Sequence, residues 1–222
     1  MRYAMAQRVL IHVPIVHTQA DMGALGQRIK NQLVRRFGER WWQRKVDLID
    51  RAWDEIEASL LNPEMPCDRL RIYQDGLPVC GRELDIVKEL AAAGSRNHRL
   101  VRELAHRGAT VMGTESGELL IEEYARVRRL LGGSEAPSKS VDLKASGVDL
   151  IQRRDRFIAT RIDSTLARGE MGILFLGMLH SIAALLPADL RLFSLMPFAD
   201  NRPTILAALR SAKSQTDHPP SL

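Results

Sequence analysis

The stretch GILFLGMLHS, residues 172–181, decides the fold class of this chain. Its run up to Leu179 consists of glycine and apolar residues, which is typical of a strand buried on both faces of a parallel sheet. The run then ends on His180, a titratable side chain at the C-terminal end of the expected strand. Two interpretations stay open here: a structural histidine that caps the strand, or the rim of an active site.

Three further apolar runs have the length and composition of strands: 8–16, 69–73 and 109–116. Strands that alternate with helical segments indicate a sheet that is at least partly parallel and covered on both faces. We therefore predict an α/β fold with a partly parallel or mixed sheet covered by helices, and a long N-terminal helical region over 21–61. In this interpretation residues 1–210 form a single domain, and residues 211–222 form a disordered tail.

The helical region carries an apolar stripe at spacings of three and four: Trp42, Val46, Ile49, Trp53, Ile56 and Leu60. The stripe packs either on the sheet or on a second subunit, and core packing is favoured over ligand stacking for its tryptophans. Gly38 is predicted to divide the region into two helices. Further along, GGSEAPSKS (132–140) is predicted to be a surface loop.

The composition is that of an ordinary globular protein: 222 residues, 45% apolar and 27% charged. A net charge of +5 favours anionic partners in general but does not identify nucleic acid. Cys67 and Cys80 form no C-x-x-C pair, so zinc-ribbon and thioredoxin-like sites are not expected, and a Cys67–Cys80 bridge is the less favoured alternative to free thiols. We recognise no signal peptide or membrane span, and expect a cytoplasmic protein without membrane association.

Each expected strand is followed by polar, mostly titratable side chains. They are His17 and Asp21, then Gln74 and Asp75, then Thr114 and Glu115, then His180 and Ser181. Because ligands bind outside the C-terminal ends of parallel strands, these groups are expected to gather there. Each has a structural alternative, such as turn formation by Asp75 in Asp-Gly. Their joint occurrence favours a functional site.

The predicted helix 149–168 precedes the last of these strands. Its inward stripe on a helical wheel is Ile151, Ile158, Ile162, Thr165 and Leu166. Arg154 and Asp155 flank this stripe. Because the helix runs antiparallel to the strand it feeds, Arg154 is expected nearer the C-terminal edge than Arg161, which lies about two turns further on.

Two histidines and a carboxylate suit two kinds of chemistry. His17, Glu115 and His180, with Asp21, can hold a divalent metal that activates water. Alternatively, one histidine acts as a general base with Glu115 as its partner or as the acid. In either case the Arg154 guanidinium would stabilise an oxyanion or bind a substrate carboxylate.

These residues resemble the superfamily that groups the TraB/PrgY pheromone-shutdown proteins, the TIKI proteases, the erythromycin esterases and the ChaN-like proteins. It is marked by two G-x-x-H motifs at the ends of the first and last core strands, with a Glu and an Arg between. GMLH (177–180) matches the second motif, and PIVH (14–17) stands where the first belongs, with proline in place of glycine. Glu115 follows an inner strand, and Arg153 and Arg154 start the helix before the last strand, as in the family. The resemblance implies a hydrolase-type site, with or without a metal.

We therefore expect a hydrolase of an ester or amide bond in a small-molecule or peptide substrate, with a divalent metal of open identity as its candidate cofactor. Its site would comprise His17, Glu115, Arg154 and His180, with Asp21 in support. The alternative is a non-catalytic protein that binds a small ligand or anion at the same rim. Nucleic-acid binding is not favoured, because the basic runs 35–45 and 126–129 are more simply solvated helix faces. Assembly of the chain into a homo-oligomer is a further alternative that the sequence does not decide.

Overall fold

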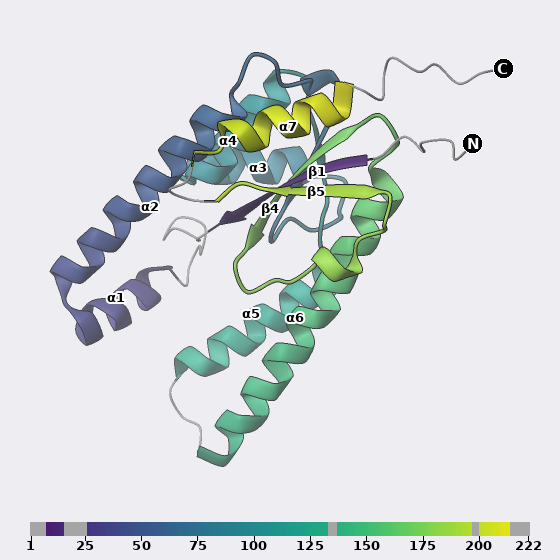
Figure 1. The fold of residues 1–222 in the computed structure, drawn as a ribbon. Helices are drawn as coiled ribbons and strands as arrows, with labels where there is room; N and C mark the ends of the chain where they lie inside the picture. The colour runs from purple at the N-terminus through teal and green to yellow at the C-terminus, as the bar shows by residue number, and fades with distance from the viewer. Residues whose placement is uncertain (1–7, 16–25, 133–136, 197–199, 214–222) are drawn as a thin grey trace.

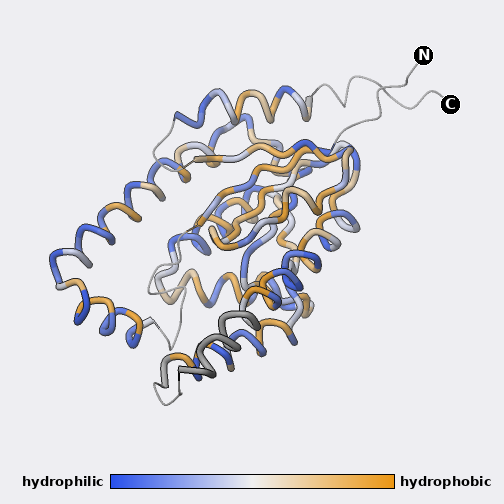
Figure 2. Tube along the Cα trace, turned by 60° about the horizontal axis from the view of Figure 1, so that its bottom comes forward, coloured by the Kyte–Doolittle hydropathy of each residue, from blue (hydrophilic) through white to orange (hydrophobic). Residues whose placement is uncertain are grey.

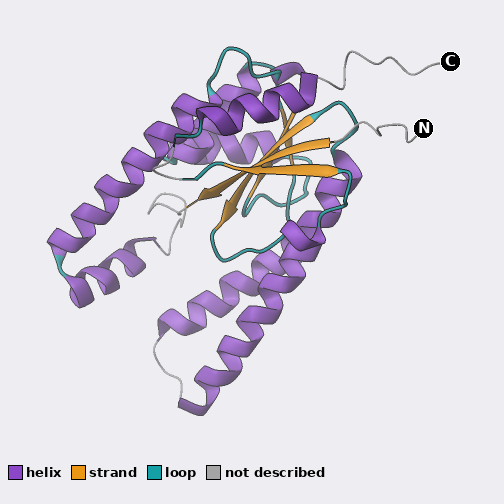
Figure 3. Cartoon of the chain, viewed as in Figure 1, coloured by secondary structure: helices purple, strands orange, loops and turns teal. Residues whose placement is uncertain are grey.

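The computed structural model describes residues 8–15, 26–132, 137–196 and 200–213. Within them one sheet has the strand order β3-β2-β4-β1-β5 (Figures 1 and 3). The strands are β1 (Arg8–Ile15), β2 (Leu70–Gln74), β3 (Thr110–Met112), β4 (Met171–Gly177) and β5 (Leu190–Ser194). All neighbouring strands pair in parallel. The predicted α/β fold is confirmed, and the sheet is parallel throughout.

β4 occupies the centre of the sheet, and all seven of its residues are buried. The apolar run quoted above continues beyond the strand, however. Met178 and Leu179 form a turn and are 66% and 81% exposed. The sheet therefore accounts for the run only as far as Gly177, and the two apolar side chains after it lie at the surface beside His180.

Helices cover both faces of the sheet. One face packs against α2 (Glu39–Leu60), α3 (Glu83–Ala92), α4 (Arg96–His106) and α7 (Arg202–Lys213), and the other against α6 (Pro137–Thr165). The strands alternate accordingly: Ile11 contributes to the first core and Leu10 to the second. In Figure 2 the apolar strands lie between helices that are mixed in hydropathy. Ile158 and Ile162 of α6 are fully buried, as the helical wheel predicts.

Two helical hairpins extend from this core. α1 (Gly26–Phe37) packs on α2, and Gly38 between them has φ 85°, a left-handed conformation that glycine adopts without strain. α5 (Gly117–Gly132) packs on α6. Figure 1 shows that both hairpins project on the side to which the arrows of β1 and β4 point. The predicted division of the N-terminal helical region at Gly38 is confirmed.

Several boundaries differ from the sequence-based prediction. The expected loop 132–140 is shorter, because α5 continues to Gly132 and α6 begins at Pro137. β5 was not predicted as a strand. α7 continues to Lys213, past the expected domain boundary at 210, and the rest of the expected tail lies outside the described residues.

The tryptophan stripe packs largely as core. Trp42, Trp53, Ile56 and Leu60 are buried, and Trp53 lies beside Phe175 of β4 with ring centroids 6.4 Å apart. Cys67 and Cys80 are both free thiols. Among the helices of the described residues, none combines the length and the apolar character needed to cross a bilayer.

Candidate functional site

Helix α6 carries Arg154 and Asp155 to the C-terminal edge of the sheet. Alternate side chains of β2 face α6, and Tyr73 lies in the core on that side. Asp75, two residues later, continues the same face and accepts a hydrogen bond from Arg154. The packing of one helix on one face of the sheet therefore brings polar groups from β2, β3, β4 and α6 together.

The Arg154 guanidinium is the centre of this cluster, and its side chain is only 5% exposed. Its Nε donates to Glu115 Oε2 at 2.7 Å, and its Nη2 donates to Glu115 Oε1 at 2.5 Å and to Asp75 Oδ1 at 2.8 Å. Its Nη1 donates to Glu123 Oε2 at 2.6 Å. One guanidinium thus holds three carboxylates from three different elements of the fold.

Backbone hydrogen bonds fix the two loops that supply Asp75 and Glu115. Residues 74–77 form a tight turn in which Leu77 N–H donates to Gln74 C=O, and Gly76 takes φ 75° as the predicted Asp-Gly turn requires. Gly76 N–H also donates to Glu115 Oε1 at 3.0 Å. In return, Glu115 N–H donates to the Leu77 carbonyl at 3.0 Å. The two carboxylates are therefore held by paired loops rather than by side-chain contacts alone.

His180 is held by Asp155, the residue next to Arg154 on α6. His180 Nδ1 lies 2.5 Å from Asp155 Oδ1, and Ser181 N–H donates to Asp155 Oδ2 at 3.0 Å. A carboxylate accepts hydrogen bonds, so the tautomer that fits this contact has its proton on Nδ1 and leaves the lone pair of Nε2 available as an acceptor. Nε2 lies 3.9 Å from Asp75 Oδ2, which is too far for a hydrogen bond. That Asp75 oxygen instead accepts from Gly177 N–H at 2.9 Å.

His12 of β1 is a second histidine on this face. It lies two residues after Leu10, which belongs to the core on the α6 side, and every second residue of a strand faces the same side. Burial, together with the nearby charge of His180, lowers the pKa of His12. Its Nε2 atom is buried and has no hydrogen-bond partner within the described part of the chain. A neutral imidazole therefore lies in the core close to His180.

The charges of the cluster do not balance. Four carboxylates, from Asp75, Glu115, Glu123 and Asp155, face one guanidinium and one imidazole. Burial, reinforced by the neighbouring Asp75, raises the pKa of Glu115, although Arg154 opposes the shift. The pKa of Arg154 is raised because its carboxylate partners outweigh its desolvation. The excess negative charge favours a proton held between Glu115 and Asp75.

Of the residues predicted from the sequence, Glu115, Arg154 and His180 lie in one cluster. His17 and Asp21 fall outside the described residues. Asp75 had been expected at this edge of the sheet but was given no catalytic or metal role, and three further cluster members had not been predicted as site residues: Glu123, Asp155 and His12. Asp75 and Asp155 each had a visible signal, at a strand end and beside the inward stripe of a helix, whereas Glu123 had none.

The donors in the described residues do not form a metal site. Arg154 and Gly76 N–H occupy the Glu115 carboxylate, and a guanidinium at this distance repels a divalent cation. Across the described ranges there is no group of three His, Cys, Asp or Glu side chains that fits a metal ion. Metal binding through His17 and Asp21 stays a prediction about residues outside those ranges.

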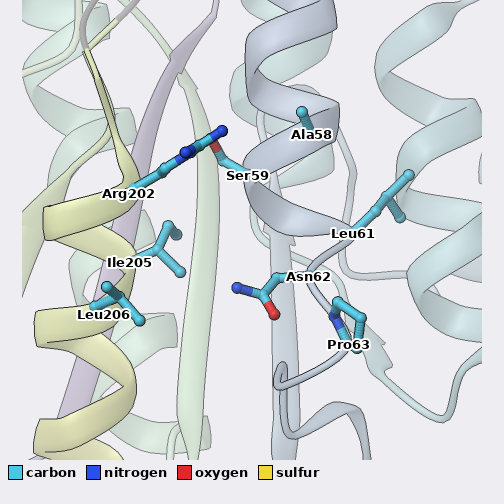
Figure 4. Close-up of a pocket in the computed structure, with 8 residues that line it drawn as sticks. All are labelled: Ala58, Ser59, Leu61, Asn62, Pro63, Arg202, Ile205 and Leu206. Atoms are coloured by element: carbon cyan, nitrogen blue, oxygen red, sulfur yellow. The ribbon is translucent and has the colours of Figure 1, made fainter.

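A hollow of about 430 Å³ lies elsewhere, between the end of α2 and the start of α7 (Figure 4). Asn62, Arg202, Ile205 and Leu206 contribute to its lining. Arg202 is its one charged lining residue, and the lining includes no residue of the cluster. This hollow lacks the acid and base groups that the strand-end cluster brings together.

Comparison of the chain with protein-family models, curated proteins and solved structures gives no match. Inference about function therefore rests on the residues and geometry described above.

Proposed function

We propose that the chain is a hydrolase of an ester or amide bond, with its active site at the Asp155–His180 pair and the Glu115–Asp75 pair. The observation that carries the proposal is the hydrogen bond from His180 Nδ1 to Asp155 at 2.5 Å. This bond fixes the ring orientation and leaves Nε2 as the proton acceptor. The same carboxylate also anchors Ser181 N–H, so the loop after β4 is tied to α6.

His180 serves as the general base in this proposal. Its Nε2 takes a proton from water while the water oxygen attacks the substrate carbonyl carbon. The resulting imidazolium is stabilised by Asp155 on one side and by Asp75, 3.9 Å from Nε2, on the other. The neutral His12 adds no positive charge to oppose this protonation.

The Glu115–Asp75 pair serves as the general acid. Burial raises the pKa of Glu115, so the pair retains a proton at a pH where an exposed carboxyl has lost it. This proton passes to the leaving oxygen or nitrogen as the bond to the carbonyl carbon breaks. Transfer of the His180 proton back to the pair then restores the starting state. Arg154 holds both carboxylates in place and is a positioning residue here.

The exposed turn after β4 favours a substrate that carries an apolar group. Met178 and Leu179 are exposed and directly precede His180. Large apolar side chains at a polar rim are typical of contact surfaces for ligands. The anion-binding alternative has less support, because Arg154 already donates to three carboxylates and the cluster has an excess of negative charge.

The test is hydrolysis of p-nitrophenyl esters and acyl p-nitroanilides of increasing acyl length. H180Q and D155N are the test variants, and H106Q changes an exposed histidine of α4 as the matched control. We expect H180Q to lower kcat by about 10²–10⁴-fold, the usual contribution of a general base, while H106Q stays at the wild-type rate. Full turnover by H180Q, or no turnover by the wild-type chain on any substrate of either series, would refute the proposal.

A further inference from the structure

The positive charge of the chain is concentrated in one segment. Residues 26–45 contain seven Lys and Arg and a single Glu, a net charge of +6, whereas the whole chain carries +5. The segment comprises α1 and the start of α2, the hairpin that projects from the core in Figure 1. We call residues 26–45 the basic arm. The rest of α2, from Val46 onward, is acidic, so the charge of this helix changes sign at the end of the arm.

The basic arm owes its positive charge to seven Lys and Arg side chains. They are Arg28, Lys30, Arg35, Arg36, Arg40, Arg44 and Lys45. Nowhere in the described ranges does one of them form an ion pair with a carboxylate. By contrast, Arg8, Arg71 and Arg96 each bind one or more carboxylates. A net charge of +6 on one segment, whose cations form no ion pair within the described residues, favours an anionic partner.

Aromatic rings lie among these cations. Phe37 and Trp41 stack with ring centroids 4.7 Å apart across the hairpin turn. The Arg36 guanidinium lies 5.0 Å from the Phe37 ring, and Lys45 Nζ lies 5.6 Å from the Trp41 ring. Phe37 is 46% exposed and Trp41 is half-buried. The tip of the arm therefore combines cations with partly exposed aromatic side chains, the combination that binds single-stranded nucleic acid.

A membrane surface is less well matched by the arm. A helix that lies in a bilayer surface presents a free apolar face. In α1 the apolar residues Ile29, Leu33 and Val34 are half-buried, whereas Arg28 and Arg35 are exposed. Five of the seven cations are arginines, whose planar fork binds phosphate oxygens in a bidentate manner. The exposed surface is thus suited to phosphate rather than to lipid chains.

The sequence alone favoured a solvated helix face for the run 35–45, but the structure adds stacked aromatic rings among its cations. We propose that the basic arm binds single-stranded nucleic acid, with its arginines on the phosphates and the Phe37–Trp41 pair beneath unpaired bases. The proposal is independent of the hydrolase site, whose residues it does not involve. Each phosphate contact releases counter-ions, so affinity must fall steeply with salt. Single-stranded DNA and RNA share this chemistry, and the assay below separates them.

The test is fluorescence anisotropy with labelled oligo(dT) and oligo(U) of about 16 nucleotides and with a matched duplex, over a series of salt concentrations. The test variant is R35Q/R36Q/R40Q. The control variant R99Q/R128Q/R129Q removes three exposed arginines elsewhere and has the same net charge. We expect the arm variant to bind on the order of 50-fold more weakly at 0.15 M salt, and its salt slope to fall by about 2. The control variant should bind like the wild type.

Tryptophan fluorescence gives a second measurement of binding, and its test variant leaves the charge of the arm unchanged. Trp41 of the arm is half-buried, whereas the other two tryptophans, Trp42 and Trp53, are buried. Oligonucleotide binding should quench the arm fluorescence, and W41F should reduce the quench. The proposal is overturned by equal binding of the two triple variants, by duplex preferred over single strands, or by binding to anionic phosphatidylserine vesicles without binding to either oligonucleotide.

Discussion

Replacing Arg154 by methionine is the sharpest test of the buried cluster. Methionine keeps most of the apolar stem but removes the guanidinium that holds Asp75, Glu115 and Glu123. The side chains of Asp75 and Glu115 are 5% and 1% exposed, so in the variant neither carboxylate regains full hydration. Glu123 is 33% exposed and can turn to water, so it adds little to the cost.

The expected loss follows from the burial of these groups. Removing one partner of a buried ion pair costs about 3–5 kcal/mol, because the remaining charge stays uncompensated. For a domain of this size, that loss corresponds to a fall in Tm of about 6–20 °C. Urea unfolding at pH 7.5, followed by circular dichroism, measures it directly. The deficit should shrink as the pH is lowered toward the ordinary Glu pKa of 4.5, because protonation removes the unpaired charges.

The neighbouring residue offers a matched control. The Arg153 side chain is 41% exposed and pairs with Glu122, which is 47% exposed, on the α5–α6 hairpin. R153M therefore removes the same charge but leaves no buried carboxylate without a partner. R154M combined with E115Q should recover part of the lost stability, because the amide that replaces the Glu115 carboxyl carries none of the negative charge that the Glu115–Asp75 pair shares. If R154M unfolds at the same urea concentration as R153M, the buried ion cluster is not what holds the two loops and α6 together.

Two further predictions concern stability. G113A should lower the free energy of unfolding by about 1–3 kcal/mol in urea, because an added Cβ would lie 2.6 Å from Val79 Cα. G117A should be neutral, because the space around its added Cβ is open. Equal effects of the two variants would contradict the packing of the two loops. The pKa of His12 is lowered, so as the pH falls the unfolded chain takes up a proton at His12 before the folded chain does. The folded state is therefore favoured fully above the ordinary pKa of 6.5, and it loses stability as the pH falls below that value. H12Q should therefore lose less stability between pH 7.5 and pH 5 than the wild type, by at most about 1.4 kcal/mol per pH unit, and an identical pH dependence would count against a buried neutral His12.

Much of the fold was predictable because its local signals agree. The apolar run at β4 is buried on both faces, and α4 begins directly after Ser95, whose side chain accepts a hydrogen bond from His98 N–H as an N-cap. β5 was missed because no helix of ordinary length separates it from β4. Only the short turn Ala183–Leu185 intervenes, so the alternation of strand and helix gives no signal there.

The candidate site was predictable only in part, because proximity along the chain differs from proximity in space. From the sequence, Glu115 and His180 were expected at strand ends, and the structure brings both into one cluster with Arg154. The expectation that Arg154 lies near the start of its helix was wrong, because α6 begins at Pro137 and Arg154 lies in its second half. The sequence could not say that Asp155 rather than Glu115 would bind His180, since that depends on the rotation of α6 about its axis. Burial of Ile158 and Ile162 sets this rotation, and it directs two consecutive residues to two different partners.

The different partners of Arg154 and Asp155 bear on the choice between a structural and a functional role for His180. A structural cap would need only one acceptor for His180, and a well-packed apolar core is often as stable as a buried ion cluster, or more so. Here four carboxylates share one guanidinium and one imidazole, and burial raises the pKa of Glu115 against the pull of Arg154. Such unbalanced charge costs stability in the folded chain, and perturbed carboxyls beside an oriented imidazole are typical of sites that move protons. Energetic cost and chemical arrangement together favour the functional interpretation of His180.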